Sequence, residues 1–128
     1  MLDHIVLTVS DLPRSIAFYE AALSPLGISH YIDYDGKDGH ADLRGFGHDR
    51  MAYFWLRQGT ADPSSAHFGF RARSRAAVDA FHAAAVAAGG VDNGAPGPRH
   101  RYDANYYAAY VFDPDGYNVE AVIKGPDL

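Results

Sequence analysis

The sequence predicts an α+β fold built from two βαβββ modules within a single domain of 128 residues. Three observations support this prediction: an internal repeat, a helix with recognisable start and stop signals in each copy, and short apolar strands separated by turns after each helix. Module one covers residues 1–58, a polar linker follows at residues 59–65, and module two covers residues 66–128.

The internal repeat becomes visible when the sequence is shifted by 63 positions, which aligns residues 4–27 with residues 67–90 without a gap. The alignment contains 6 identities in 24 positions, among them His4 with His67 and Phe18 with Phe81. The identity count alone is low, but both copies predict the same local structure. The two halves of the chain are therefore expected to be related modules.

Each copy of the repeat reads as a strand followed by a helix. Ile5–Val9 and Phe68–Phe70 contain the β-branched and aromatic residues that favour strands. Asp11 and Ser74 are good N-cap residues for the helices that follow, because their side-chain oxygens accept hydrogen bonds from free backbone amides. Gly27 indicates the end of the first helix.

Three further strands are expected after each helix. They are Ser29–Tyr34, His40–Phe46 and Arg50–Arg57 in module one, and Val91–Asn93, Asn105–Phe112 and Tyr117–Ile123 in module two. The stretch Gly94–Arg101 contains two prolines and is expected to form an irregular loop over one end of a sheet. Loops of that kind often close binding sites.

Composition excludes several classes of function. The formal net charge is −5, the pI is near 5.7 and no Lys/Arg cluster is present, which argues against nucleic acid and anionic membranes as partners. The absence of cysteine excludes disulfides and thiolate chemistry. No basic leader followed by an apolar core opens the sequence, and no apolar run reaches the length of a membrane span, so a cytoplasmic protein is expected.

One carboxylate interrupts an apolar strand near the end of the chain. Glu120 follows Val119 and precedes Ala121, and a buried carboxylate is unfavourable unless a cation compensates it. The repeat places His4 and His67 at equivalent positions, at the starts of equivalent strands. Two imidazoles and one carboxylate suit a first-row divalent ion and leave positions open for water or substrate. The alternative is that the three residues only form hydrogen bonds with one another.

The segments LDHIVLTVSDLPRSIAFYEAAL, HFGFRARSRAAVDAFH and FDPDGYNVEAV resemble the vicinal oxygen chelate superfamily, which groups glyoxalase I, bleomycin-resistance proteins and extradiol dioxygenases. The resemblance covers essentially the whole chain. It implies that the two modules form a curved, open mixed sheet around a cavity with a divalent metal ion (Fe, Mn, Zn or Ni) on its floor. It further implies that the metal ligands are His4, His67 and Glu120, and that the protein is a homodimer in which the modules pair within one chain or between chains.

The resemblance also assigns residues around the metal. The glyoxalases of this superfamily have a fourth ligand, usually Glu, at a position that is Trp55 here, and an indole N–H cannot ligate a metal. This departure argues against glyoxalase I activity. Tyr110 matches a tyrosine beside the metal in the fosfomycin-resistance and dioxygenase branches and is the candidate catalytic acid or hydrogen-bond donor; the alternative is a packed aromatic residue. The residues expected to contact substrate are Tyr53, Trp55, Arg57, Tyr106 and Tyr107.

Two functions follow from this reading. The first is a metal-dependent enzyme, a lyase, oxygenase or transferase, that acts on a small oxygen-rich or aromatic molecule by chelating it. The second is a binding protein without catalytic activity that sequesters a small molecule, as bleomycin-resistance proteins do. A complete set of metal ligands favours the first, because a sequestering protein does not need one.

Overall fold

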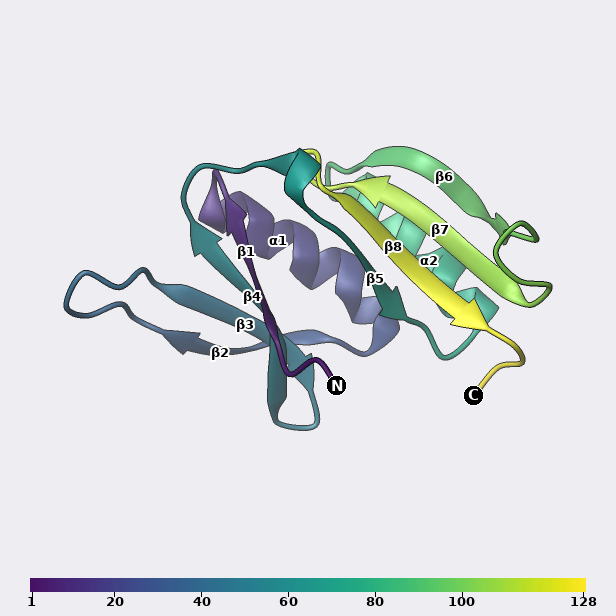
Figure 1. The fold of residues 1–128 in the computed structure, drawn as a ribbon, viewed down its shortest axis with the longest axis horizontal. Coiled ribbons are helices and arrows are strands. Elements are labelled where there is room, and N and C mark those ends of the chain that lie inside the picture. The colour runs from purple at the N-terminus through teal and green to yellow at the C-terminus, as the bar shows by residue number, and fades with distance from the viewer.

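The computed structural model describes residues 1–128 and contains two four-stranded sheets and two α-helices (Figure 1). In module one the elements are β1 (Ile5–Val9), α1 (Leu12–Leu23), η1 (Ser24–Leu26), β2 (Ser29–Tyr34), β3 (Leu43–His48) and β4 (Met51–Gln58). After η2 (Pro63–Ser65), module two contains β5 (His67–Arg71), α2 (Arg75–Ala87), β6 (Val91–Pro98), β7 (Tyr106–Phe112) and β8 (Asn118–Lys124). The α+β fold of two βαβββ modules is confirmed.

The two sheets have the same topology. The strand order is β1-β4-β3-β2 in the first and β5-β8-β7-β6 in the second, with the first strand of each module parallel to the last and the remaining pairs antiparallel. Both sheets are open, so β1 and β5 each have one edge free of ladder hydrogen bonds. This matters for the site, because His4 and His67 lie at the starts of these two edge strands.

Two of the expected strand boundaries are corrected by the structure. The strand expected at His40–Phe46 lies at Leu43–His48, because residues before it form a turn in which Asp38 has a φ of 54°. The strand expected to stop at Asn93 continues as β6 to Pro98, where a loop was predicted. Proline is tolerated there because β6 is an edge strand with two register shifts.

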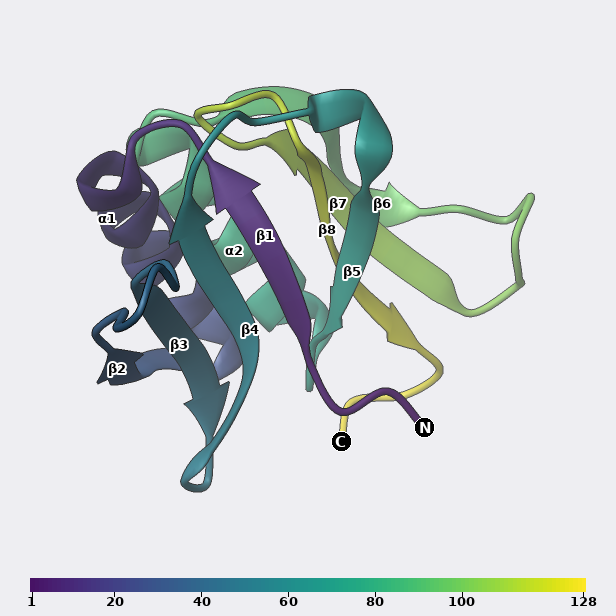
Figure 2. The same cartoon turned by 60° about the vertical axis from the view of Figure 1, so that its left-hand side comes forward.

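The helix signals in the sequence are confirmed. The Asp11 side chain accepts a hydrogen bond from the Arg14 amide at 3.2 Å, and the Ser74 hydroxyl accepts one from the Ala77 amide at 3.0 Å. Gly27 has a φ of 76°, a left-handed conformation that glycine adopts at low cost, and it ends η1. Both helices lie against the same side of the sheets and contact each other (Figures 1 and 2). Neither helix is long and apolar enough to cross a membrane.

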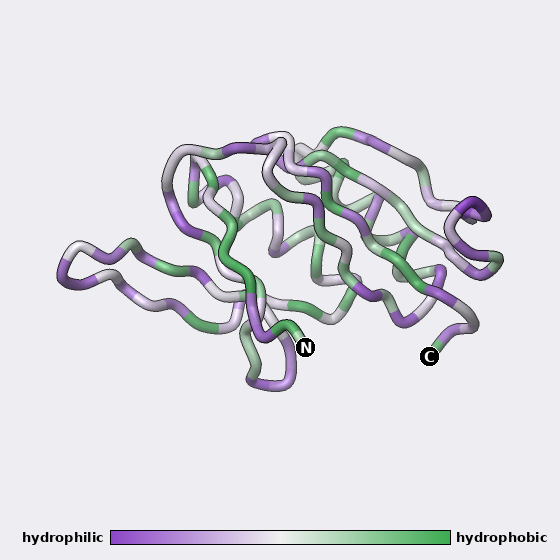
Figure 3. Tube along the Cα trace, viewed as in Figure 1, coloured by the Kyte–Doolittle hydropathy of each residue, from purple (hydrophilic) through white to green (hydrophobic).

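One hydrophobic core joins the modules. A single cluster of 22 buried residues includes members of both sheets and both helices. The ring of Phe54 on β4 lies 5.3 Å from that of Phe68 and 5.2 Å from that of Phe70 on β5, measured between centroids. Figure 3 shows how hydropathy varies along the chain, with hydrophobic stretches in β1 and β8 and hydrophilic residues at the tip of the β2–β3 hairpin. Because the helices and the core occupy one side of the sheets, the opposite faces are available for a binding site.

The turn between β7 and β8 also connects the two modules. The buried carboxylate of Asp113 accepts a hydrogen bond from the Tyr19 hydroxyl on α1 at 2.6 Å and from the backbone amides of Asp115 and Tyr117 at 2.9 Å each. Asp115 in turn accepts hydrogen bonds from the amide and hydroxyl of Ser10. Burial raises the pKa of Asp113 even though these hydrogen bonds oppose the shift. The DPDG turn therefore fixes the start of β8, and with it Glu120, relative to module one.

Candidate functional site

Glu120 lies on the face of β8 that is turned away from the helices. Val119 and Ala121, its neighbours in sequence, point into the core, and strand alternation sends the Glu120 side chain to the opposite face. Glu120 is nevertheless only 4% exposed to solvent. Gly69 on β5 lies opposite it in register, where a Cβ would approach the Glu120 Oε1 atom to 3.4 Å. The glycine thus leaves room beside the carboxylate.

The Glu120 carboxylate faces the imidazole of His67. The Nε2 atom of His67 lies 3.1 Å from Glu120 Oε1, and Nδ1 lies 3.0 Å from the carbonyl oxygen of Asn118. A carbonyl can only accept, so Nδ1 carries a proton and Nε2 is the ring nitrogen that faces the carboxylate. A contact of 3.1 Å between this nitrogen and a carboxylate oxygen needs a proton or another cation between the two atoms. This is the arrangement in which a histidine that ligates a metal is oriented by a backbone carbonyl.

Two phenols border the pair. The Tyr106 hydroxyl donates a hydrogen bond to Glu120 Oε2, and Tyr110 is paired in register with Glu120 across β7 and β8. The ring of Tyr110 stacks on that of His67, with centroids 6.2 Å apart. Burial, followed by the hydrogen bond to Glu120, raises the pKa of Tyr106, and burial together with the Glu120 charge raises the pKa of Tyr110. Both phenols therefore remain protonated at neutral pH and can donate hydrogen bonds.

These residues share a polar cavity of about 570 Å³ on the helix-free face of the second sheet. Its lining consists of His67, Asn93, Gly94, Arg99, Arg101, Tyr102, Tyr106, Tyr110, Asn118 and Glu120. Of the residues proposed from sequence, the structure thus brings together His67, Glu120, Tyr106 and Tyr110. The two arginines were missed. They lie around His100 in the stretch that the sequence marked as a loop able to close a site.

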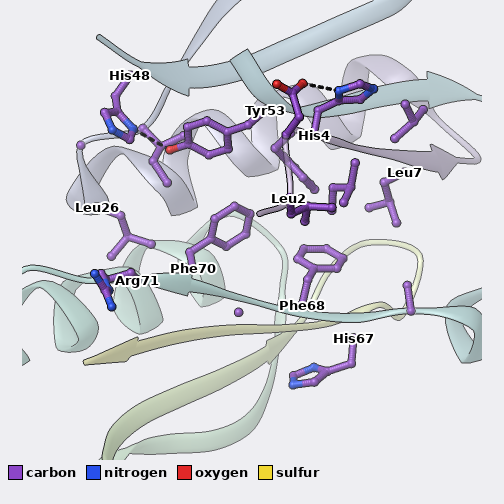
Figure 4. A pocket seen from close by; sticks show the side chains of 18 of the residues that line it. Leu2, His4, Leu7, Leu26, His48, Tyr53, His67, Phe68, Phe70 and Arg71 are labelled. Atoms are coloured by element: carbon purple, nitrogen blue, oxygen red, sulfur yellow. Dashed lines mark hydrogen bonds and ion pairs between the residues drawn. The ribbon is translucent and has the colours of Figure 1, made fainter. Parts of the chain in front are cut away.

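His4 does not reach this cavity within the chain. Its Nδ1 atom is hydrogen-bonded to the Asp3 carboxylate at 2.6 Å, and it lines a second cleft, of about 940 Å³ between β1 and β5, whose lining also includes His67. Figure 4 shows Phe68 and Phe70 pointing into this cleft and His67 pointing out of it, away from His4. No group of three His, Cys, Asp or Glu side chains that could hold a metal ion exists within the chain. The single chain therefore presents two of the three expected ligands.

The expected substrate residues of β4 also lie away from the Glu120 cavity. Tyr53 lines the cleft between the sheets and its hydroxyl is 2.7 Å from His48 Nδ1. The Trp55 indole stacks on Tyr34 at 5.4 Å, and Arg57 donates two hydrogen bonds to the Thr8 hydroxyl. Tyr53, Trp55 and Arg57 thus lie on the helix-free face of the first sheet, whereas Phe54 and Leu56 of the same strand point into the core.

Tyr107 differs from its neighbour Tyr106 because adjacent residues of a strand point to opposite faces. Its hydroxyl donates a hydrogen bond to Asp79 on α2 at 2.7 Å, and the guanidinium of Arg75 lies 4.9 Å from its ring centroid. The structure therefore places Tyr107 on the helix side of the sheet.

The residues present fit a divalent ion as part of a coordination sphere. Glu120 is a nearly inaccessible carboxylate whose only ion-pair partner is His67, and no Lys or Arg neutralises it. An imidazole nitrogen and a carboxylate oxygen suit Fe, Mn, Zn or Ni. The His67–Glu120 pair, which we call the half-site, is thus suited to a metal but provides only two protein ligands.

Comparison with known proteins agrees with this architecture. The sequence matches the family model of the Glyoxalase/Bleomycin resistance protein/Dioxygenase superfamily over residues 1–121. A search of curated proteins gave no significant match. Among solved structures, the chain is similar to a glyoxalase/bleomycin resistance protein from Albidiferax ferrireducens T118, with 30% sequence identity, a TM-score of 0.76 and coverage of 98% of this chain and 99% of that chain.

The chain is also similar to two further solved structures. A glyoxalase I mutant from Zea mays is 29% identical with a TM-score of 0.71, and the match covers 93% of this chain and 44% of that chain. A mutant of the fosfomycin resistance protein FosX from Listeria monocytogenes, complexed with Mn(II) and 1S,2S-dihydroxypropylphosphonic acid, is 20% identical with a TM-score of 0.67, over 94% of this chain and 90% of that chain. The latter similarity is one of fold. Because the family model spans nearly all of the sequence and both modules are present, the chain belongs to the Glyoxalase/Bleomycin resistance protein/Dioxygenase superfamily.

Proposed function

We propose that this protein is a metal-dependent enzyme of its superfamily that acts on a small oxygen-rich or aromatic molecule by chelating it. One observation carries the proposal: the buried Glu120 carboxylate faces the Nε2 atom of His67, while the other ring nitrogen is held by a backbone carbonyl. A buried carboxylate without a Lys or Arg partner is stabilised when a cation binds beside it. The FosX structure with Mn(II) supports the choice of a divalent ion.

The residues of the cavity have separate roles in this proposal. His67 and Glu120 would hold the ion, and Tyr106 orients the carboxylate through its hydrogen bond to Oε2. When bound, a divalent ion would supply Lewis-acid chemistry toward oxygen atoms of the substrate. Tyr110, with its raised pKa and its place beside the half-site, donates a hydrogen bond or a proton to the substrate. Proton abstraction next to a carbonyl, epoxide opening and catechol-type oxygenation all use such a site. The proposal therefore covers the chelation of the substrate, which these reactions share, and does not choose among them.

We further propose that His4 of the partner subunit in a homodimer supplies the third ligand. The edges of β1 and β5 are free, and the cleft between them exposes Leu2 and Val6, which are 78% and 41% exposed. A second copy that covers this cleft would bury the apolar side chains and both edges. It would also bring the helix-free face of its first sheet, with Tyr53, Trp55 and Arg57, toward the Glu120 cavity.

The experiment that tests the metal proposal is elemental analysis of protein purified without chelator, compared with three variants. His67→Ala and Glu120→Ala are expected to lose the metal. His82→Ala is the matched control, because it removes an imidazole that pairs with Asp92 on the protein surface. If wild-type protein holds no stoichiometric metal and the half-site variants take up as much added metal as the wild type, the proposal is wrong.

A mixing experiment tests the contribution of the partner subunit. His4→Ala and His67→Ala homodimers each lack every complete site, whereas a mixed dimer of the two retains both histidines of one site when the ligands come from different chains. Co-expression with two affinity tags isolates the mixed dimer. We expect about one metal ion per mixed dimer and none in either parent. A metal-free mixed dimer would show that the ligands come from the same chain.

A further inference from the structure

We propose that Arg99 forms an anion-binding subsite in the Glu120 cavity, so that the substrate is a small molecule with a carboxylate or phosphate-type group. This inference rests on the proposed function, since it names the substrate class of the same cavity. The observation behind it is a positioned guanidinium without an acidic partner, beside the half-site and in a chain whose net charge is −5.

Arg99 is held in place by contacts that leave its charge uncompensated. Its Nη2 atom donates to the carbonyl oxygen of Ala95 at 2.7 Å, and Nη1 donates to that of Pro98 at 3.3 Å. No carboxylate lies within ion-pair distance of it. A guanidinium has five N–H donors in a planar fork, and these two bonds leave three of them for a ligand. A fixed fork with free donors is suited to bind a carboxylate or phosphate with two parallel hydrogen bonds.

The backbone of β6 makes room for this side chain. Arg99 lies over the ring of Tyr110, with 5.4 Å from Cζ to the ring centroid. A Cβ on Gly94 would lie 3.2 Å from Arg99 Nη2 and 2.9 Å from the Tyr110 ring, and one on Gly97 would lie 3.3 Å from Arg99 Nη1. Both glycines therefore allow the guanidinium to lie close to the strand and the tyrosine. The same tyrosine is thus shared by the anion subsite and the half-site.

The distance between Arg99 and the half-site determines how long the ligand is. Gly94, Tyr110 and Glu120 are register partners on three consecutive strands. Neighbouring strands are about 4.8 Å apart, so the subsite over Gly94 lies roughly 10 Å from the Glu120 strand. A ligand that spans from the half-site to Arg99 is therefore the size of a small organic acid or phosphoester, and its anionic end lies away from the chelated oxygens.

Two other cations strengthen the positive potential of this region. The guanidinium of Arg101 lies 4.8 Å from the ring centroid of Tyr102, and Lys124 Nζ lies 5.4 Å from that of Tyr106. Neither side chain has an acidic partner within ion-pair distance. Because positive charges held in a cavity attract anions and raise their local concentration, we expect neutral analogues to bind more weakly than charged ones.

The test is a titration of the metal-free, full-length protein followed by amide chemical shifts in NMR. Inorganic phosphate and malonate are titrated separately at constant ionic strength, to separate phosphate-type from carboxylate ligands. We expect saturable shifts at Gly94, Gly97 and Arg99 with at least one of the two anions. Arg99→Gln should raise the dissociation constant about tenfold or more. Arg99→Lys keeps the charge but loses the planar pair of donors, so its dissociation constant should lie between those of wild type and Arg99→Gln.

Arg75→Gln is the matched control, because it also removes one positive charge stacked on a tyrosine, but on the helix side of the sheet. It should change the dissociation constant by less than about twofold. Shifts that do not saturate, or that Arg99→Gln and Arg75→Gln weaken equally, would show nonspecific attraction and overturn the proposal. Metal uptake, measured on separate portions of each protein after addition of Mn(II) or Zn(II), separates the two claims. Anion binding without metal uptake supports the subsite and contradicts the metal-dependent function, and metal uptake without anion binding does the reverse.

Discussion

His67 Nε2 and the Glu120 carboxylate face each other across 3.1 Å, on two parallel neighbouring strands, while the second nitrogen of His67 is bonded to the Asn118 carbonyl. This relationship gives the cavity its chemistry, because it fixes which imidazole nitrogen is free to ligate. Tyr106 holds the other carboxylate oxygen. The buried carboxylate and the half-exposed imidazole are therefore oriented from both sides before any ligand arrives.

The first prediction concerns the orienting role of Tyr106. Tyr106→Phe removes the hydrogen bond to Glu120 Oε2 and keeps the ring. Loss of such an outer contact typically weakens metal binding about 10- to 100-fold, and we expect a change in this range by competition with a metal indicator. Tyr102→Phe, an exposed tyrosine of the same cavity, is the control. Equal affinity of Tyr106→Phe and wild type would show that the contact does not tune the site.

The second prediction concerns the connection between the modules. Tyr19→Phe removes the hydroxyl that donates to the buried Asp113 carboxylate and leaves that oxygen unsatisfied. We expect the free energy of unfolding to fall by about 1–3 kcal/mol in urea denaturation. Tyr31→Phe, at a residue 43% exposed, should have no measurable effect. If both variants are equally stable, the hydrogen bond contributes nothing to the association of the modules.

The third prediction concerns the pH dependence of stability. Partial burial disfavours the charged form of His30, but hydrogen bonds with Asp33 and Glu20 outweigh it and raise its pKa above 6.5. Because the folded state binds this proton more strongly, its contribution to stability is complete below pH 6.5 and is lost as the pH rises through the folded pKa. Arg44, whose Nε lies 3.8 Å from Asp33, shares the same carboxylate and stays charged throughout.

This pH effect is measured by urea denaturation at several pH values on either side of neutrality. In wild type the free energy of unfolding should decline over that window, and in His30→Gln the decline should be smaller. His30→Gln also removes the ring that stacks on Phe46, with centroids 5.1 Å apart, so the comparison uses the slope with pH and not the absolute stability. Parallel slopes would contradict the assignment.

The fourth prediction concerns Trp55, the single tryptophan of the chain. A Cβ on Gly45 would lie 2.6 Å from the Trp55 Cζ3 atom, so Gly45→Ala should displace the indole from its stack on Tyr34. We expect a shifted fluorescence emission and a loss of stability of about 1–3 kcal/mol. Tyr34→Phe keeps the aromatic stack and should leave the emission unchanged. An unchanged spectrum in Gly45→Ala would show that the indole does not depend on this glycine.

Much of the fold could be predicted from local signals, because Asp11, Ser74 and Gly27 mark helix ends that depend on nearby backbone alone. β6 could not, because prolines in an edge strand read as loop residues and only its pairing with β7 shows otherwise. Within the site, alternation along β8 and the apolar neighbours of Glu120 were sufficient to single it out. The environment of Arg99 was not predictable, since it depends on glycines and a tyrosine of another strand.

His4 illustrates a different limit. The repeat places it at the position equivalent to His67, but equivalence in sequence does not specify which copy of the chain lies beside it. Within one chain the first sheet turns His4 toward Asp3 and the cleft between β1 and β5. The third ligand of the proposed site is thus a question about assembly, which local sequence patterns do not encode.

The most direct test of the central claim is a crystal structure of the protein with Mn(II) or Zn(II), with the ion located by anomalous scattering. The account predicts one peak per chain between His67 Nε2 and the Glu120 carboxylate, at about 2.0–2.2 Å from each ligand atom, and His4 of the partner subunit beside it. An unchanged contact of 3.1 Å between His67 and Glu120 with no anomalous peak at the half-site would contradict the claim.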